Sequence, residues 1–164
     1  MDRLPIQALI HNKDFNLSSC KFDLIPQFNG KPKEALWTST YLNSIEISDW
    51  YIWCKKEDFE IKDCLYLIEP KEDTRVLKLN NVEDLVELPT VRAFNQITLD
   101  FERIFKRGYS GITLTKEGLI NIKSLSSLRR LNSVVSSFWS WDCESTVWFN
   151  TDWIKSIKLE RILR

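Results

Sequence analysis

The order of hydrophobic and polar positions along the chain predicts a series of short strands. β-Branched and aromatic residues favour strands, and the side chains of a strand alternate between its two faces. Residues 75–79 alternate apolar and basic side chains, so one face of this strand is expected to meet water. A turn at 70–73 is expected to join it to the strand before it as a hairpin. The predicted strands are 35–41, 64–68, 75–79, 110–115, 119–122, 146–149 and 157–162.

Other segments carry apolar residues at helical spacing. Positions i, i+3 and i+4 lie on one face of a helix, so Trp50 and Trp53 are expected to share a face of a short helix that Asp49 caps. The other predicted helices are 82–88, 99–107 and 124–137. Strands and helices together indicate an α+β fold in a single domain over residues 1–164.

Length and charge narrow the classes of partner. The 164 residues are 43% hydrophobic, which is enough for one substantial core. The 23 basic and 23 acidic residues cancel, so no strong basic surface for duplex DNA and no attraction to an anionic membrane is expected. No run of about 18 apolar residues is present, which predicts neither a signal peptide nor a membrane span, and hence a cytoplasmic protein.

The residues that bind metals and phosphates are sparse. Four cysteines without a Cys-x-x-Cys pair and one histidine predict no metal site and indicate reduced thiols. The sequence contains no glycine-rich phosphate loop, no dinucleotide-binding glycine motif and no zinc-protease motif. Any chemistry must therefore come from dispersed residues.

Two acidic residues lie among tryptophans near the C-terminus. Asp142 and Glu144 belong to the sequence Trp-Ser-Trp-Asp-Cys-Glu-Ser at 139–145. Large aromatic neighbours would partly desolvate these carboxyl groups, which raises a carboxyl pKa and suits a base or a stabiliser of a cationic transition state. If the segment is extended, both carboxylates are expected on the same side.

Four further candidate residues lie in the first quarter of the chain. His11, the only histidine, follows an apolar run. Ser39 belongs to a Ser/Thr cluster at the end of a predicted strand, and such hydroxyls both donate and accept hydrogen bonds to a ribose or an amide. Trp37 or Tyr41 offers an aromatic ring for a planar ligand.

Taken in order, these segments resemble a family of small, uncharacterised phage and bacterial proteins. The resemblance covers residues 9–150 and rests on the order of five short motifs more than on any one of them. The motifs read His11-Asn-Lys, Lys31-Pro-Lys-Glu-Ala-Leu-Trp-Thr-Ser39, Asp49-Trp-Tyr-Ile-Trp-Cys54 with Phe59, Tyr109-Ser-Gly-Ile112 and Trp141-Asp-Cys-Glu-Ser145.

That layout is similar to the ADP-ribosyltransferase fold. The resemblance implies a split antiparallel β-sandwich with short flanking helices that holds NAD as a substrate in its cleft. It also implies that His11 contacts the ribose, that Ser39 or Tyr41 faces the nicotinamide, and that Trp37 stacks on the ring. Glu144 or Asp142 would then stabilise the oxocarbenium-like charge that develops as nicotinamide leaves.

The resulting hypothesis is mono-ADP-ribosyl transfer from NAD to a protein or nucleic-acid acceptor, by a viral or mobile-element effector that acts on a host. An alternative from another class is a non-catalytic module that keeps the fold and binds a protein through exposed aromatic residues. A third possibility is a phosphotransferase that acts on RNA ends, which the balanced charge makes less favourable.

Overall fold

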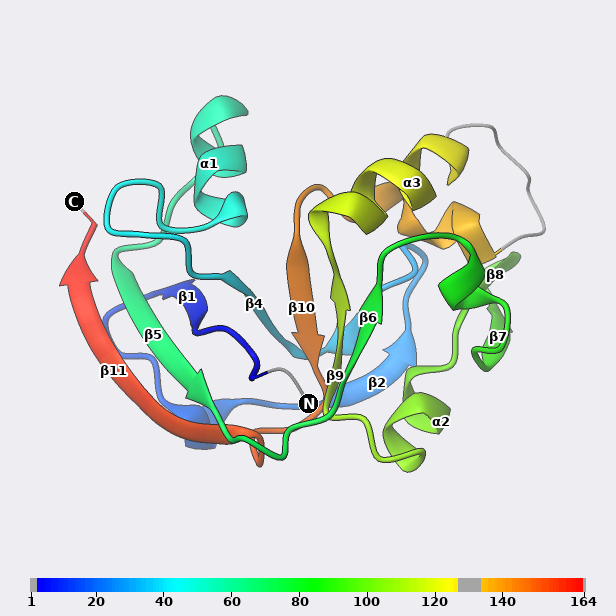
Figure 1. Ribbon diagram of the computed structural model, residues 1–164, viewed down its shortest axis with the longest axis horizontal. Coiled ribbons are helices and arrows are strands. Elements are labelled where there is room, and N and C mark those ends of the chain that lie inside the picture. The colour runs from blue at the N-terminus through cyan, green and yellow to red at the C-terminus, as the bar shows by residue number, and fades with distance from the viewer. Residues whose placement is uncertain (1–2, 127–133, 164) are drawn as a thin grey trace.

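The main structural element is a strongly bent seven-stranded sheet (Figure 1). The structure is a computed structural model that describes residues 3–126 and 134–163. Neighbouring strands of this sheet run antiparallel, except that β6 and β9 are parallel. Across the sheet the seven strands are β11 (Ile154–Ile162), β5 (Cys64–Pro70), β1 (Gln7–His11), β4 (Leu36–Thr40), β10 (Ser145–Trp148), β9 (Gly111–Leu114) and β6 (Val76–Leu79).

The α+β class is confirmed, and the main strands belong to one connected sheet. Strand β4 pairs with β1 along one edge and with β10 along the other. Ser39 and Thr40 pair with β1, whereas residues 36–38 pair with β10, so the two ends of β4 join the two halves of the molecule into one sheet. The strands thus form a single connected sheet that bends at β4 (Figure 1).

The hairpin expected from residues 64–79 is wrong. Both strands form, but β5 lies between β11 and β1, whereas β6 lies at the far edge beside β9. Residues 71–75 cross from one half of the sheet to the other, and the amide of Lys71 donates to the carbonyl oxygen of Trp153. Leu79 of β6 is buried in the largest core cluster, and this burial favours pairing of β6 with β9 over a hairpin with β5.

Two small hairpins accompany the main sheet and were not predicted. The first joins β2 (Asp23–Pro26) to β3 (Pro32–Glu34), and the second joins β7 (Thr90–Ala93) to β8 (Gln96–Leu99). Phe94 and Asn95 connect the second pair with φ angles of 47° and 63°. Positive φ at both central residues belongs to the tight turns whose twist suits a hairpin. The turn is difficult to predict from the sequence because its first central residue is Phe94, whereas such turns usually have Asn, Asp or Gly there.

Helix α1 (Asp49–Lys56) forms as expected, with a shift of one residue at its start. The cap is Ser48, whose hydroxyl accepts the amide of Tyr51 at 3.3 Å, and Asp49 is the first helical residue. Helix α2 (Phe101–Lys106) is capped by Asp100, within the predicted segment 99–107. The helix expected over 82–88 is only the 3₁₀ turn η2 (Glu83–Leu85).

The strand expected at 119–122 is wrong, because these residues belong to helix α3 (Lys116–Ser126). Thr115 accepts the amide of Gly118 through its hydroxyl at 3.0 Å, as a helix cap does. The helix expected over 124–137 is divided. Residues 124–126 end α3, residues 134–137 begin the 3₁₀ segment η3 (Val134–Ser140), and 127–133 lie outside the described residues.

The buried side chains form three clusters on the faces of the sheet. The largest lies under α2, α3 and η3 and contains Phe101, Phe138 and Trp141. A second is built around Trp148 and Trp153, whose rings stack with centroids 3.5 Å apart. In the part of the chain that the structure describes, no helix has both the length and the apolar character needed to cross a membrane.

Gly118 allows α3 to approach the end of β6, and its replacement should destabilise the fold. A Cβ at this position would lie 2.0 Å from the carbonyl oxygen of Leu79, so backbone must move. We expect Gly118→Ala to lower the free energy of unfolding by roughly 1–3 kcal/mol, as overpacking does. Ile120→Ala, at a side chain that is 70% exposed on the same helix, should change it by about 0.5 kcal/mol or less. Urea denaturation of both variants measures the difference, and equal effects would contradict this contact.

Candidate functional site

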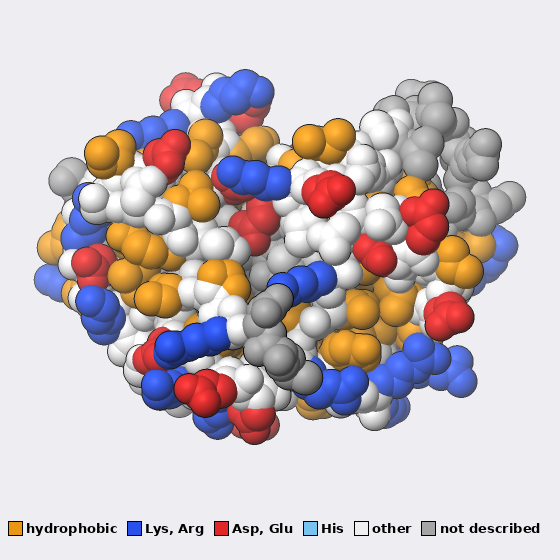
Figure 2. All heavy atoms as spheres, viewed as in Figure 1, with side chains coloured by type: hydrophobic (Ala, Val, Ile, Leu, Met, Phe, Trp, Pro, Cys, Tyr) orange, Lys and Arg blue, Asp and Glu red, His pale blue; other side chains and the backbone are white. Residues whose placement is uncertain are grey.

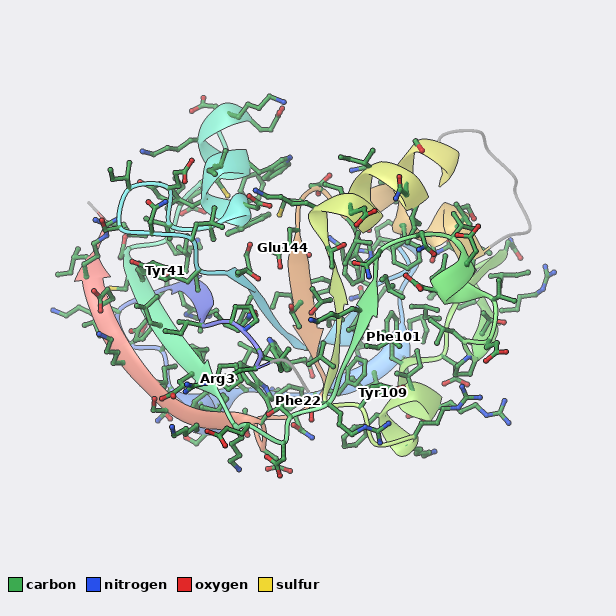
Figure 3. All side chains as sticks on the ribbon, viewed as in Figure 1. Arg3, Phe22, Tyr41, Phe101, Tyr109 and Glu144 are labelled. Carbon is green, nitrogen blue, oxygen red and sulfur yellow. The ribbon has the colours of Figure 1, made fainter. Side chains whose placement is uncertain are left out.

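The Glu144 carboxylate joins the ends of three elements. One of its oxygens, Oε2, accepts the Ser39 hydroxyl at 2.7 Å and the Thr40 amide at 2.9 Å, while Oε1 accepts the Thr40 hydroxyl at 2.9 Å. The Ser39 oxygen in turn accepts the amide of Trp50, in the first turn of α1, at 3.4 Å. Glu144 is only 7% exposed, and Figure 3 shows it at the start of β10, between α1 and α3. This buried anion is thus fully hydrogen-bonded, as burial requires.

An ion pair lies beside this junction. Lys116, the first residue of α3, places its ammonium 2.9 Å from the Asp49 carboxylate in α1. The hydrogen bond that Lys116 donates to the Asp49 carboxylate raises the pKa of Lys116, and the charge of Glu144 adds to that rise. Lys116 therefore stays protonated and connects α3 electrostatically to α1 and to the Glu144 junction.

A cavity of about 520 Å³ opens next to the junction. Four of the sequence-predicted site residues line it: His11 from β1, Trp37 and Ser39 from β4, and Asp142 from the segment before β10. These residues are separated by up to 131 positions in the sequence (142 − 11), and pairing of β1 with β4 and of β4 with β10 brings them together.

The walls of this cavity are aromatic as well as polar. Trp37, Trp50 and Trp141 all contribute to its lining. The rings of Trp37 and Trp141 meet edge to face with centroids 4.9 Å apart, which fixes the orientation of the Trp37 indole. At the other end, the exposed ring of His11 lies against Phe15 with centroids 4.7 Å apart. Such a surface suits a ligand with planar rings and polar substituents.

The two carboxylates do not share a side. Residues 141–144 are not extended, because the chain bends at Cys143 and Glu144 and the strand begins only at Ser145. Asp142 is exposed, lines the 520 Å³ cavity and lies 3.4 Å from the Lys123 ammonium. Glu144 instead lines a second cavity, of about 450 Å³. The expected alternation of a strand fails because the bend precedes it.

Tyr41 lies away from the 520 Å³ cavity. It follows the last residue of β4 and packs against the core cluster that contains Ala8, Ile47 and Leu65. Of the two hydroxyl residues expected to face a nicotinamide, only Ser39 lines the cavity.

The second cavity is lined in part by Gln7, Thr113, Thr146 and Trp148. Thr38 donates to the Gln7 side-chain oxygen at 2.7 Å and accepts the Trp148 indole N–H at 2.7 Å. The hydroxyls of Thr113 and Thr146 are 2.7 Å apart. Figure 2 shows a depression between the α1 and α3 sides, with acidic and basic side chains along it.

Cys143, between the two carboxylates, is a neutral thiol. Burial raises its pKa to about 12, and the negative charge of Glu144 contributes to the rise. A nucleophilic cysteine needs a lowered pKa, so this thiol is not suited to covalent catalysis. Within the described residues, no group of three or more His, Cys, Asp or Glu side chains is placed to hold a metal ion.

Sequence reasoning missed three residues of this region. Thr40 binds Glu144 through both its amide and its hydroxyl, and Trp50 lines the cavity from α1. Lys31 also lines the cavity, with its ammonium 5.2 Å from the centroid of the Trp37 ring. The Ser/Thr cluster contained a signal for Thr40, whereas the contact of Lys31 with Trp37 depends on the turn between β2 and β3.

Neither a protein-family model, nor a curated protein, nor a solved structure matches this chain. The function must therefore be argued from the cavity and its residues.

The Glu144 junction predicts a difference in stability between the two carboxylates. Glu144→Ala would leave the Thr40 amide and hydroxyl without their acceptor, whereas the Ser39 hydroxyl keeps the Glu144 carbonyl oxygen at 3.0 Å, so we expect a loss of about 1–3 kcal/mol in the free energy of unfolding. Asp142→Ala removes an exposed carboxylate and should cost about 1 kcal/mol or less. Urea denaturation at neutral pH measures both values. Equal losses would show that the Glu144 hydrogen bonds do not hold β4 and β10 together.

Proposed function

We propose that this protein transfers ADP-ribose from NAD to a macromolecular acceptor within the 520 Å³ cavity. The observation that carries the proposal is the convergence of His11, Trp37, Ser39 and Asp142 on one cavity from distant parts of the chain. An ADP-ribosyltransferase-like fold is part of the same proposal. The order of a histidine strand, a Ser/Thr strand and a late carboxylate supports it.

The proposed roles follow from the position of each side chain. The exposed imidazole of His11 would hydrogen-bond a ribose hydroxyl at the mouth of the cavity. Trp37 would pack against the nicotinamide ring, since an indole offers a large flat apolar surface. Ser39 would face the nicotinamide side, in a position fixed by its hydrogen bonds to Glu144 and Trp50.

The two carboxylates would have different roles in the reaction. The glycosidic bond between the ribose C1′ and the nicotinamide nitrogen breaks, and nicotinamide leaves with the bonding electron pair. Asp142 lines the cavity and is placed to stabilise the positive charge on the ribose. An acceptor nucleophile then bonds to C1′ and loses its proton to a base. Glu144 would act as a positioning residue through Ser39, because its oxygens are already bonded within the protein.

Release of nicotinamide tests the transfer reaction. We expect the wild-type protein to release nicotinamide from NAD and Asp142→Asn to reduce kcat by about 10²–10³-fold, as loss of one electrostatic stabiliser does. Asp152→Asn changes an exposed carboxylate that lines neither cavity, and should leave the rate unchanged. Glu144→Gln keeps one acceptor oxygen and should have a smaller effect than Asp142→Asn; the reverse order would exchange the two roles.

Binding of NAD gives a readout that does not depend on turnover. NAD at about 100 times its dissociation constant should stabilise the protein by roughly 2.7 kcal/mol. The rise in melting temperature should be smaller for His11→Ala. Absence of nicotinamide release would refute ADP-ribosyl transfer, and absence of a melting shift as well would show that NAD does not bind.

A non-catalytic protein-binding module is the second candidate, and exposed aromatic residues favour it. Phe28, Phe94 and Trp139 are 65%, 70% and 53% exposed. Their segments lie together, because the Gln96 side chain donates to the carbonyl oxygen of Phe28 and the Ser140 hydroxyl donates to that of Asn29. Exposed aromatic groups on neighbouring segments are typical of protein interfaces.

The two candidates predict opposite mutational patterns. If the protein acts as a binding module, Phe94→Ala and Trp139→Ala should each weaken a partner complex by about 10-fold or more, as loss of an aromatic anchor does. Asp142→Asn should leave that complex intact. Affinity capture with each variant, quantified against the wild type, measures this. A partner lost on carboxylate substitution and retained on aromatic substitution would contradict the binding-module candidate.

A further inference from the structure

Lys31 is a half-buried lysine without an anionic partner. No carboxylate among residues 3–126 and 134–163 lies within ion-pair distance of its ammonium, whereas Lys33, two positions along the same hairpin, pairs with Asp23 at 3.0 Å. Burial lowers the pKa of Lys31, and the charge of Asp142 partly opposes that shift. A lysine in this setting gains from an anion that arrives with a ligand.

The backbone holds Lys31 in a defined place. It follows Gly30, which has φ of +75°, in the turn between β2 and β3. Its amide donates to the Asn29 side chain at 3.0 Å, and its carbonyl oxygen accepts the amide of Gln27 at 2.8 Å. The turn lies against η3, since a Cβ on Gly30 would approach the Ser137 carbonyl oxygen to 2.6 Å. The side chain therefore begins from a fixed point beside the cavity.

The charge around the cavity is locally positive. Among the described residues that line it, the lysines are Lys21 and Lys31, and the only acid is Asp142. The Asp142 carboxylate already has the Lys123 ammonium at 3.4 Å. Asp142 thus acts on Lys31 only at longer range and is shared with Lys123, while the Lys31 ammonium lies 5.2 Å from the centroid of the Trp37 ring.

We propose that Lys31 binds a phosphoryl group of the cavity's ligand, which makes that ligand a phosphorylated nucleotide whose ring lies beside Trp37. A compact ammonium next to an aromatic surface provides both contacts that such a ligand needs. This inference rests on the same cavity as the proposed function and adds the residue that selects a nucleotide over a nucleoside. It does not require that the ligand be turned over.

Paired ligands that differ only in phosphorylation test the inference. Wild-type protein should bind ADP more tightly than adenosine in isothermal titration. Lys31→Gln should weaken ADP by about 10- to 100-fold, the range for a hydrogen bond to a charged group, and leave adenosine unchanged. Lys31→Arg keeps the positive charge and should retain most of the preference for ADP. Lys33→Gln is the matched control on the same hairpin, outside this cavity, and should bind both ligands as the wild type does.

Three results would overturn this role for Lys31. Equal weakening of ADP and adenosine in Lys31→Gln would mean that the lysine acts through the Trp37 ring, and unchanged ADP binding would mean that it contacts no phosphate. Failure of wild-type protein to prefer ADP would also overturn it. A preference for ADP that depends on Lys31, found without nicotinamide release from NAD, would support this inference and refute ADP-ribosyl transfer.

Discussion

The hydrogen bonds of the buried Glu144 carboxylate are the constraint on which the site depends. A carboxylate that is 7% exposed must be satisfied within the protein, and Ser39 and Thr40 provide the donors. These bonds fix the end of β4 against the start of β10, and the link from Ser39 to Trp50 fixes α1 beside them. The walls of the 520 Å³ cavity meet at this junction.

Strand β4 separates two different environments. Its Trp37 and Ser39 line the 520 Å³ cavity beside Trp50 and Trp141, while its Thr40 lines the second cavity with Gln7, Thr113 and Thr146. Alternation of side chains across a strand explains how Trp37 and Ser39 share one face and Thr38 and Thr40 the other. Glu144 lies where the two faces meet, at the end of the strand. Glu144 lines the second cavity directly and contacts the 520 Å³ cavity through its hydrogen bond with Ser39.

The spacing of apolar residues was sufficient to predict a strand or helix where its type did not depend on the segments it packs against. Strands β4, β5, β6, β9, β10 and β11 and helices α1 and α2 overlap the segments predicted from apolar spacing. The pattern failed at α3, where Leu119 and Ile122 fit both a strand and a helix and the Thr115 cap decided for the helix. It also failed at the β7–β8 turn, where Phe94 has a positive φ angle, which is uncommon for a phenylalanine.

The sequence by itself determined the α+β class, most of the strands and the set of polar and aromatic residues from which a site can be built. Only the tertiary structure decided that β4 pairs with both β1 and β10, because strand pairing joins residues that are distant in sequence. It likewise placed Asp142 and Glu144 in different cavities, since a bend before β10 removed their shared side. Lys31 joined the site for the same reason: its contact with Trp37 depends on a turn held against η3.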